Sequence, residues 1–276
     1  MNEPLLHSKT KLLIDSYLEM MPHSLLLVAP KGSGKLYRAM WLAEQAQLTP
    51  IHVSVLEDKK MIGIEQIQHL YTQTRSGSPT MVIIEGAEQM STDAQNALLK
   101  LLEEPPENTH FALTANDTEG VLPTIRSRCQ VITLIPPAIA DLKSYALEES
   151  DDLDNSELSA LVATTQGQIG ALMSILSDTN ANEAHSALVK EAKQFYGSSA
   201  YDRLKIAGSH NLDRDWALQL LGLLSVIISA LISSGSSDPT RARRLQRQVD
   251  EIERATTTLK QAGNPKIHIS RLALAL

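Results

Sequence analysis

The chain has 276 residues, of which 43% are hydrophobic and 21% charged, the composition of a soluble globular protein that can hold two or three domains. Its net charge of −7 excludes a general affinity for nucleic acid, so any contact with DNA must be local or shared with partners. One cysteine excludes an internal disulfide and a multi-thiolate zinc site, and we find no signal-peptide pattern, so we expect a cytoplasmic protein.

The first half of the chain alternates between strand and helix patterns. Short apolar runs typical of buried strands occupy residues 25–28, 51–55, 82–84, 111–115 and 131–134. Apolar residues at helical spacing occupy residues 5–20, 36–47, 62–74 and 92–104. We expect Thr92 and Gln95 to form a capping box at the start of the last of these helices, which Pro105 and Pro106 end. This alternation predicts an α/β fold, a parallel sheet flanked by helices.

From Pro136 and Pro137 onward we find helical patterns only. They occupy residues 142–149, 156–165, 169–176, 184–196, 201–207, 214–232, 239–261 and 267–275. A polar loop is predicted at residues 233–237, and the apolar run 218–232 fits a buried helix better than a membrane span. We expect three domains, at residues 1–136, 137–180 and 181–276, the second a small set of helices and the third a helical bundle.

A glycine-containing loop follows the first predicted strand. In residues 29–35, APKGSGK, the backbone around Gly32 and Gly34 and the ammonium of Lys35 could meet a phosphate. The P-loop pattern also asks for glycine at the first position and serine or threonine after the lysine, and here these are Ala29 and Leu36. Leucine offers no oxygen to magnesium, so the sequence favours a vestigial loop over a live ATP site.

Two motifs carry a resemblance to a known family. The runs NALLKLLEEPP, residues 96–106, and LPTIRSRCQ, residues 122–130, resemble the clamp-loader branch of the AAA+ family, whose members open ring-shaped sliding clamps onto DNA. Within that branch they are most similar to the delta-prime group of the bacterial DNA polymerase III clamp loader. The resemblance implies a P-loop domain, a helical lid and a C-terminal collar.

The resemblance also implies that the ATPase residues are lost. The family's ATPases carry Asp-Glu-Ala-Asp where this chain has residues 85–88, EGAE, and Gly86 cannot replace the glutamate that polarises water. Glu85 could stand in for the magnesium-organising aspartate, and we expect Glu88 to point to the other face if the strand has ended in a turn. The lid's Gly-x-x-Arg-type motif matches residues 167–172, which contain no arginine. Asn116, at the sensor position, is left to hold the loop.

One functional group of the family remains. In clamp loaders the arginine of the Ser-Arg-Cys motif, here Arg128, enters the neighbouring subunit's ATP site as a finger. The alternative is that Arg128 pairs with a local carboxylate such as Glu85. We interpret Arg126 as structural and Cys129 as a small buried residue rather than a nucleophile.

The resemblance therefore predicts a subunit that does not hydrolyse ATP, binds nucleotide weakly at most, and supplies Arg128 in trans. Its expected partners are the clamp-loader ATPase subunit and the delta subunit, with the sliding clamp met indirectly, primed DNA met through the assembled complex, and no membrane. The alternatives are an active ATPase motor subunit and a scaffold of the same fold without a role in replication. Four zinc cysteines that many of these relatives carry are absent, so no zinc site is expected.

A basic run lies near the C-terminus. Its members are Arg241, Arg243, Arg244, Arg247 and Arg254. A surface for nucleic acid or a partner is one reading. The sequence favours the other, a solvated helix face whose arginines pair with Asp250, Glu251 and Glu253.

Overall fold

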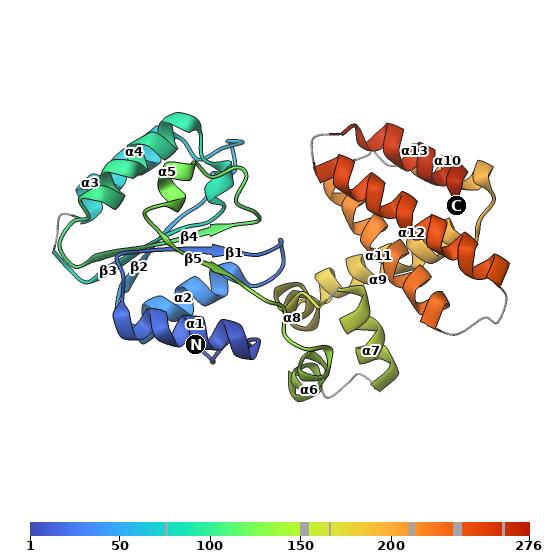
Figure 1. Ribbon diagram of the computed structural model, residues 1–276, viewed down its shortest axis with the longest axis horizontal. Coiled ribbons are helices and arrows are strands. Elements are labelled where there is room, and N and C mark those ends of the chain that lie inside the picture. The colour runs from blue at the N-terminus through green and yellow to red at the C-terminus, as the bar shows by residue number, and fades with distance from the viewer. Residues whose placement is uncertain (75–76, 150–154, 166, 210–212, 234–238, 261–262) are drawn as a thin grey trace. The chain divides into compact units, whose positions relative to one another are not determined.

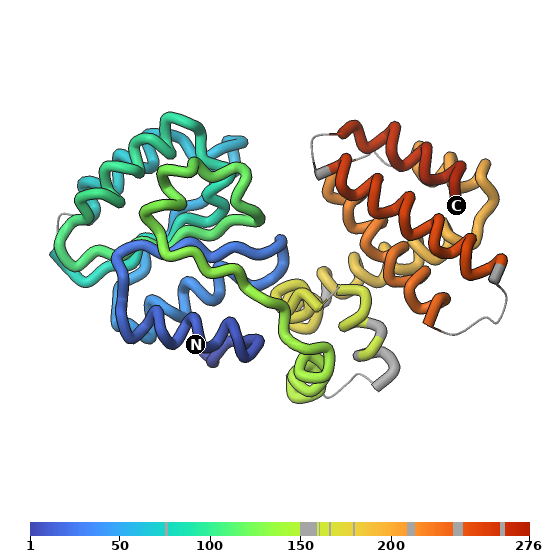
Figure 2. The backbone as a smooth tube through the Cα atoms, in the orientation of Figure 1, coloured from blue at the N-terminus to red at the C-terminus, as the bar shows by residue number. Residues whose placement is uncertain are grey.

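The computed structural model describes the chain except for residues 75–76, 150–154, 166, 210–212, 234–238 and 261–262 (Figures 1 and 2). The chain forms two compact units, Met1–Tyr145 with Gly167–Ala171, and Ala146–Gln166 with Leu172–Leu276. The structure divides into two units rather than three domains, and it places Gly167–Ala171 with the first unit. The predicted boundaries at residues 136 and 180 therefore stay a prediction. The polar loop predicted at 233–237 lies, from residue 234 on, outside the described residues.

The first unit contains a five-stranded parallel sheet (Figure 1). Its strands are β1 (Ser24–Val28), β2 (Thr49–Val53), β3 (Thr80–Ile84), β4 (Thr109–Ala115) and β5 (Gln130–Thr133), in the order β2-β3-β4-β1-β5. All five predicted strands are confirmed to within two residues at each end. Because β1 lies between β4 and β5, the loop after β1 reaches the same edge of the sheet as the residues that follow β4.

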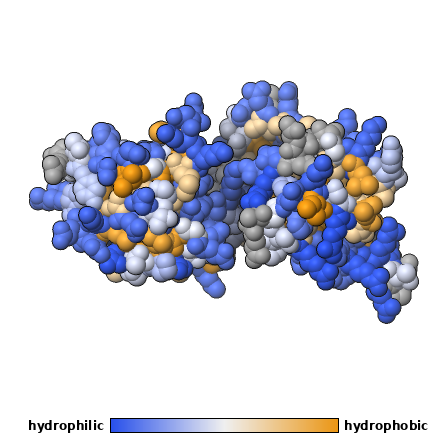
Figure 3. Space-filling model, turned by 90° about the horizontal axis from the view of Figure 1, so that it is seen from above, coloured by the Kyte–Doolittle hydropathy of each residue, from blue (hydrophilic) through white to orange (hydrophobic). Residues whose placement is uncertain are grey.

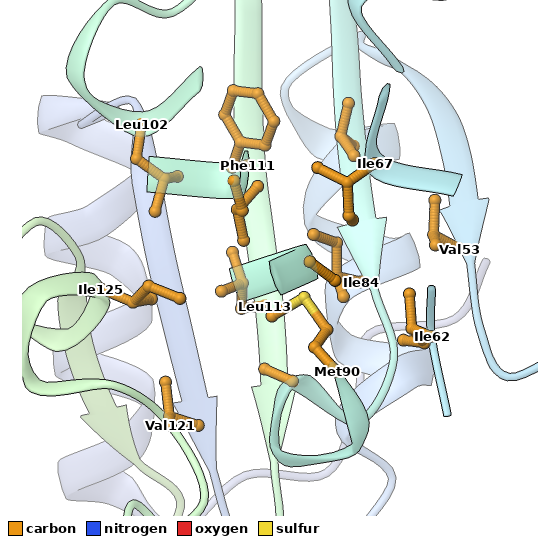
Figure 4. Close-up of a cluster of buried hydrophobic side chains, with 14 of the residues drawn as sticks. Val53, Ile62, Ile67, Ile84, Met90, Leu102, Phe111, Leu113, Val121 and Ile125 are labelled. Atoms are coloured by element: carbon orange, nitrogen blue, oxygen red, sulfur yellow. The ribbon is translucent and has the colours of Figure 1, made fainter. Parts of the chain in front are cut away.

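Helices cover both faces of the sheet (Figure 1). They are α1 (Ser8–Met20), α2 (Lys35–Gln45), α3 (Ile64–Gln73), α4 (Thr92–Glu103) and α5 (Pro123–Arg126), with a short 3-10 helix η2 (Ala87–Gln89). Alternate residues along each strand point to opposite faces. In β1, Leu26 packs with α3, α4 and α5, while Leu25 and Leu27 pack with α1 and α2. Figure 4 shows Ile84, Phe111 and Leu113 directed into the first of these cores.

The predicted capping box at Thr92 is wrong. Ser91 is the N-cap of α4, and its side chain accepts the N–H of Ala94 at 3.1 Å. Gln95 is buried and turns away from the helix end: its amide donates to the Gly120 carbonyl at 3.0 Å, and its oxygen accepts the N–H of Leu122 at 2.8 Å. Gln95 thereby ties α4 to the segment that leads into α5.

The second unit is helical. With α6 (Ile139–Glu149), which begins in the first unit, its helices are α7 (Asn155–Thr164), α8 (Ile169–Ser177), α9 (Thr179–Gly197), α10 (Ala200–Ser209), α11 (Arg214–Ser233), α12 (Pro239–Lys260) and α13 (Pro265–Ala275). Among the described residues no strand follows Thr133, as the sequence predicts. Helices α9 to α13 share one apolar core, with α11 at its centre.

Helix α11 is mostly apolar after its first two residues, Arg214 and Asp215. It is the one described helix whose length and mean hydropathy would also allow a membrane span. Six of its residues are buried in the helical core, Ala217, Leu220, Leu221, Leu223, Leu224 and Ile228. The surface seen in Figure 3 is mostly hydrophilic, with apolar residues in small separate patches. The burial of α11 fits the predicted core helix.

Candidate functional site

The glycine-containing loop lies between β1 and α2, in the position that the sequence predicts for a P-loop. Gly32 has φ +82° and Gly34 has φ +78°, both in the left-handed region that side chains with a Cβ rarely adopt. Gly34 is the N-cap of α2, and Lys35 is the first residue of that helix. The loop backbone therefore requires glycine at both of these positions.

The ammonium of Lys35 is directed back onto its own loop. It donates to the carbonyl oxygens of Ala29 at 2.6 Å and Pro30 at 2.9 Å, and to the Oδ1 atom of Asn116 at 3.0 Å. An ammonium has three N–H donors, and each of them has an acceptor here. Burial lowers the pKa of Lys35, opposed by the negative charges of Glu88 and Glu85.

The space beside the two glycines is filled by the first turn of α8. The N–H of Ala171 donates to the Gly32 carbonyl at 3.0 Å, so the loop satisfies one of the four N–H groups that a helix start leaves open. A Cβ added at Gly170 would lie 2.7 Å from that carbonyl oxygen and 2.9 Å from the amide nitrogen of Gly34. Gly170 lies in the segment that the sequence analysis matches to a Gly-x-x-Arg-type motif, and only glycine fits so close to the loop backbone.

A buried arginine, which sequence reasoning missed, also binds the loop. Arg38 of α2 is only 3% exposed; it donates to the carbonyl of Ser33 and, at 3.1 Å, to that of Leu5. Burial lowers its pKa to about 10. Its position on the buried face of α2, among Ala39, Trp41 and Leu42, is the one sequence signal that could have indicated it.

The acidic residues after β3 are bound to neighbouring groups. Glu85 lies 3.0 Å from the Nε2 atom of His52. Glu88 does not point away from the site: its carboxylate accepts the backbone N–H of Asn116 at 3.1 Å, and Gly120 lies close to its side chain. The prediction was that Glu88 faces elsewhere if the strand ends in a turn; the chain does turn there, through η2, and Glu88 nevertheless contacts Asn116.

Arg128 lies two residues after α5 and is exposed. Its guanidinium donates to the Thr124 carbonyl at 3.0 Å and forms an ion pair with the carboxylate of Glu103, the last residue of α4. The side chains are 36% and 49% exposed, respectively. A local carboxylate does pair with Arg128, but Glu85 was the wrong candidate, because it is bound to His52 instead.

Two residues near Arg128, Cys129 and Arg126, are less exposed than Arg128 itself. Cys129 packs against the apolar core under α4 and α5, and burial raises the pKa of its thiol to about 12. Arg126 is less exposed than Arg128, and its Nε atom is buried without a hydrogen-bond partner among the described residues. These positions agree with the structural roles predicted for both.

The basic run lies on α12. Arg254 pairs with Glu251 at 3.0 Å, as the interpretation of a solvated face expects. Arg244 donates to the C-terminal residue, Leu276, at 3.4 Å. Arg241, Arg243 and Arg247 are exposed, and the structure records no ion pair between them and the described carboxylates. The predicted pairing is therefore confirmed for one arginine of the five.

Comparisons with known proteins match this chain to subunits of DNA polymerase III and of replication factor C. Residues 45–138 match the family described as "DNA polymerase III, delta subunit". The delta' subunit of DNA polymerase III from Haemophilus influenzae is 34% identical over 40% of this chain and 34% of its own length. Replication factor C subunit 5 of mouse is 32% identical over 58% of this chain and 51% of its length. The chain spans about half, or less, of the length of the curated relatives that it matches.

Solved structures share the fold over a larger part of the chain. A DNA polymerase III gamma subunit-related protein of Thermotoga maritima superposes with a TM-score of 0.56, covering 95% of this chain and 97% of its own at 18% identity. The Holliday junction branch migration motor RuvB of the same organism gives a TM-score of 0.51 over 73% of this chain at 13% identity. These likenesses show the fold alone.

Proposed function

Because the chain belongs to the AAA+ clamp-loader family, we propose that it serves as a delta-prime-like subunit, which takes part in clamp loading without hydrolysing ATP itself. In this proposal it assembles in the cytoplasm with the clamp-loader ATPase subunit and the delta subunit. It meets the sliding clamp indirectly, and primed DNA through the assembled complex.

The occupied phosphate loop is the observation that carries this proposal. The ammonium of Lys35 is bound to two loop carbonyls and Asn116. Gly170 lies against Gly32 and Gly34 in the space beside the loop. Leu36 brings no oxygen to the site. We infer that a triphosphate with its magnesium ion does not fit here, and that nucleotide binds weakly at most, since binding would require the lid turn to withdraw and Lys35 to exchange partners.

In this proposal Arg128 is the residue that acts on a neighbouring subunit. Its guanidinium is exposed and carries two charged or polar contacts of its own chain, whereas Lys35 and Arg38 are directed inward. Because a guanidinium keeps its charge and can donate two parallel hydrogen bonds to phosphate oxygens, it suits a finger that stabilises charge in a neighbour's site.

Two other functions fit these residues less well. An active motor subunit shares the fold of the gamma-related structure, but that likeness carries no activity, and Leu36 and Gly86 oppose it. A scaffold outside replication would need no exposed arginine at the end of a Ser-Arg-Cys motif. The delta-prime-like function accounts for both the closed loop and the exposed Arg128.

The test is a reconstituted loader with the ATPase and delta subunits, sliding clamp and primed DNA, in which this chain carries Arg128→Ala. We expect assembly to survive, while the one site that the finger serves loses on the order of a thousandfold in rate, so that total hydrolysis falls by that site's share. Arg126→Ala, at the end of α5 and two residues before Arg128, is the matched control and should hydrolyse normally. Equal hydrolysis by both variants would remove the finger from the proposal.

A further inference from the structure

We propose that Glu103 is a positioning residue for Arg128, holding the guanidinium at the surface in the orientation that a neighbouring subunit's phosphate requires. The proposal rests on the function proposed above and adds to it a second residue, contributed by a different helix. The observation behind it is the ion pair between the end of α4 and the residues after α5.

The contacts of Arg128 leave part of its guanidinium available. Its NH1 group donates to the Thr124 carbonyl at 3.0 Å and lies 3.5 Å from the Ser127 hydroxyl, and its NH2 group donates to Glu103. A guanidinium has five N–H donors, so at least two remain without an acceptor among the described residues. The side chain is thus anchored on one part of its fork while the other part stays available for phosphate oxygens.

Helix stability does not account for Glu103. It is the last residue of α4, where the partial negative charge of the helix end disfavours a carboxylate. Glu104, the next residue, is equally acidic and exposed, and has no ion pair among the described residues. Two carboxylates therefore share an unfavourable helix end, and only one of them faces the arginine. That arrangement points to a role for Glu103 that its neighbour lacks.

Because the pair is exposed, it can orient the guanidinium of Arg128 without holding it tightly. Exposed ion pairs stabilise a protein only weakly, so the approach of a highly charged phosphate can redistribute the guanidinium's hydrogen bonds at little cost. A free arginine side chain loses much rotamer freedom when it binds. Because the pair with Glu103 removes part of that freedom beforehand, the neighbour's site meets a guanidinium that is already extended and oriented.

The experiment compares three single variants and one double variant in the full loader with clamp and primed DNA: Glu103→Gln, Glu104→Gln, Arg128→Ala, and Glu103→Gln with Arg128→Ala. Glutamine keeps the size of the side chain and removes its charge. The readouts are kcat and KM for ATP, together with the yield of assembled loader and the denaturation midpoint of the isolated chain. Glu104→Gln is the matched control for removing one exposed negative charge from the same helix end.

We expect Glu103→Gln to lower kcat at the finger-dependent site by about three- to tenfold, with KM, assembly and the denaturation midpoint unchanged. Glu104→Gln should behave as the unmodified chain, and Glu103→Gln should have no further effect once Arg128 is alanine. A normal kcat for Glu103→Gln, or an equal loss with and without Arg128, overturns the positioning role. If Arg128→Ala alone leaves hydrolysis intact, the proposed function fails first, and the two failures are thereby told apart.

Discussion

The Lys35 ammonium donates a hydrogen bond to Oδ1 of Asn116, 3.0 Å away, and so joins the residues after β1 to those after β4. The sequence places Lys35 in a vestigial phosphate loop and leaves Asn116, at the sensor position, to hold that loop. In the folded chain they contact each other, and their separation of 81 positions makes the bond a long-range tie across the sheet edge.

This tie predicts that Lys35 stabilises the fold. Lys35→Met should lower the free energy of unfolding by about 1–3 kcal/mol, because hydrogen bonds to a charged group are lost while two carbonyls and Asn116 keep unmet acceptors. Chemical denaturation of the isolated chain measures this. Lys60→Met, which removes an exposed lysine, is the control; equal midpoints for both variants would contradict the role.

The isolated chain should show no ATP turnover above background. Leu36 provides no magnesium ligand and Gly86 no side chain for polarising water, so the lost base alone removes roughly two to four orders of magnitude in rate. Phosphate release from the purified chain with ATP and magnesium measures this. Magnesium-dependent turnover that disappears in Lys35→Ala would instead favour the motor subunit.

The contact between Gly170 and the loop predicts that even a methyl group there is costly. Gly170→Ala should destabilise the first unit by about 1–3 kcal/mol, because its Cβ would lie 2.7 Å from a backbone oxygen that cannot move freely. Gly208→Ala in α10 is the matched control, since nothing lies within 4 Å of an added Cβ there and it should be neutral or slightly stabilising. Denaturation midpoints that rank the two variants the other way would contradict the contact.

Arg128→Lys should rescue clamp-stimulated hydrolysis poorly compared with the unmodified chain. Lysine keeps the positive charge but has no planar fork with which to donate two parallel hydrogen bonds. It also changes the contacts with Glu103 and the Thr124 carbonyl, which use different nitrogens of the guanidinium. Initial rates in the assembled loader measure this. Full activity with lysine would show that charge alone suffices.

The buried thiol of Cys129 predicts a loss of stability at alkaline pH. Burial raises its pKa from 9.0 to about 12 in the folded chain. Because the folded state disfavours the thiolate, the stability due to this shift is fully present below pH 9 and is lost as the pH rises toward 12. Denaturation midpoints between pH 8 and pH 11 should fall less steeply in Cys129→Ala than in the unmodified chain. Parallel slopes for the two would contradict the assignment.

Where local patterns decide the structure, the sequence predicts it well. The β-branched runs in strands such as residues 82–84 and the period of the helices depend on neighbours along the chain, and these elements are found within a few residues of their predicted bounds. The resemblance of residues 96–106 and 122–130 to clamp loaders also pointed to the family that the comparisons support.

The site's contacts depend on partners far along the chain, and these could not be read locally. Glu103 and Arg128 are 25 positions apart, and Gln95 reaches Leu122 rather than its own helix end. Arg38 was overlooked because a single charged residue on an apolar helix face gives no indication of which carbonyls it meets. The sequence shows that residues 167–172 contain no arginine. Only the folded structure shows that Gly170 lies against the backbone of Gly32 and Gly34.

The place of β1 in the middle of the sheet has a consequence for how the chain is made. Both neighbours of β1, β4 and β5, are translated long after it, since they begin at Thr109 and Gln130. At about 5–20 residues per second, the ribosome needs on the order of ten seconds to deliver β4 after β1. During that interval Leu25, Leu26 and Leu27 have neither partner strand. The nascent chain therefore exposes an apolar segment of the kind that chaperones bind.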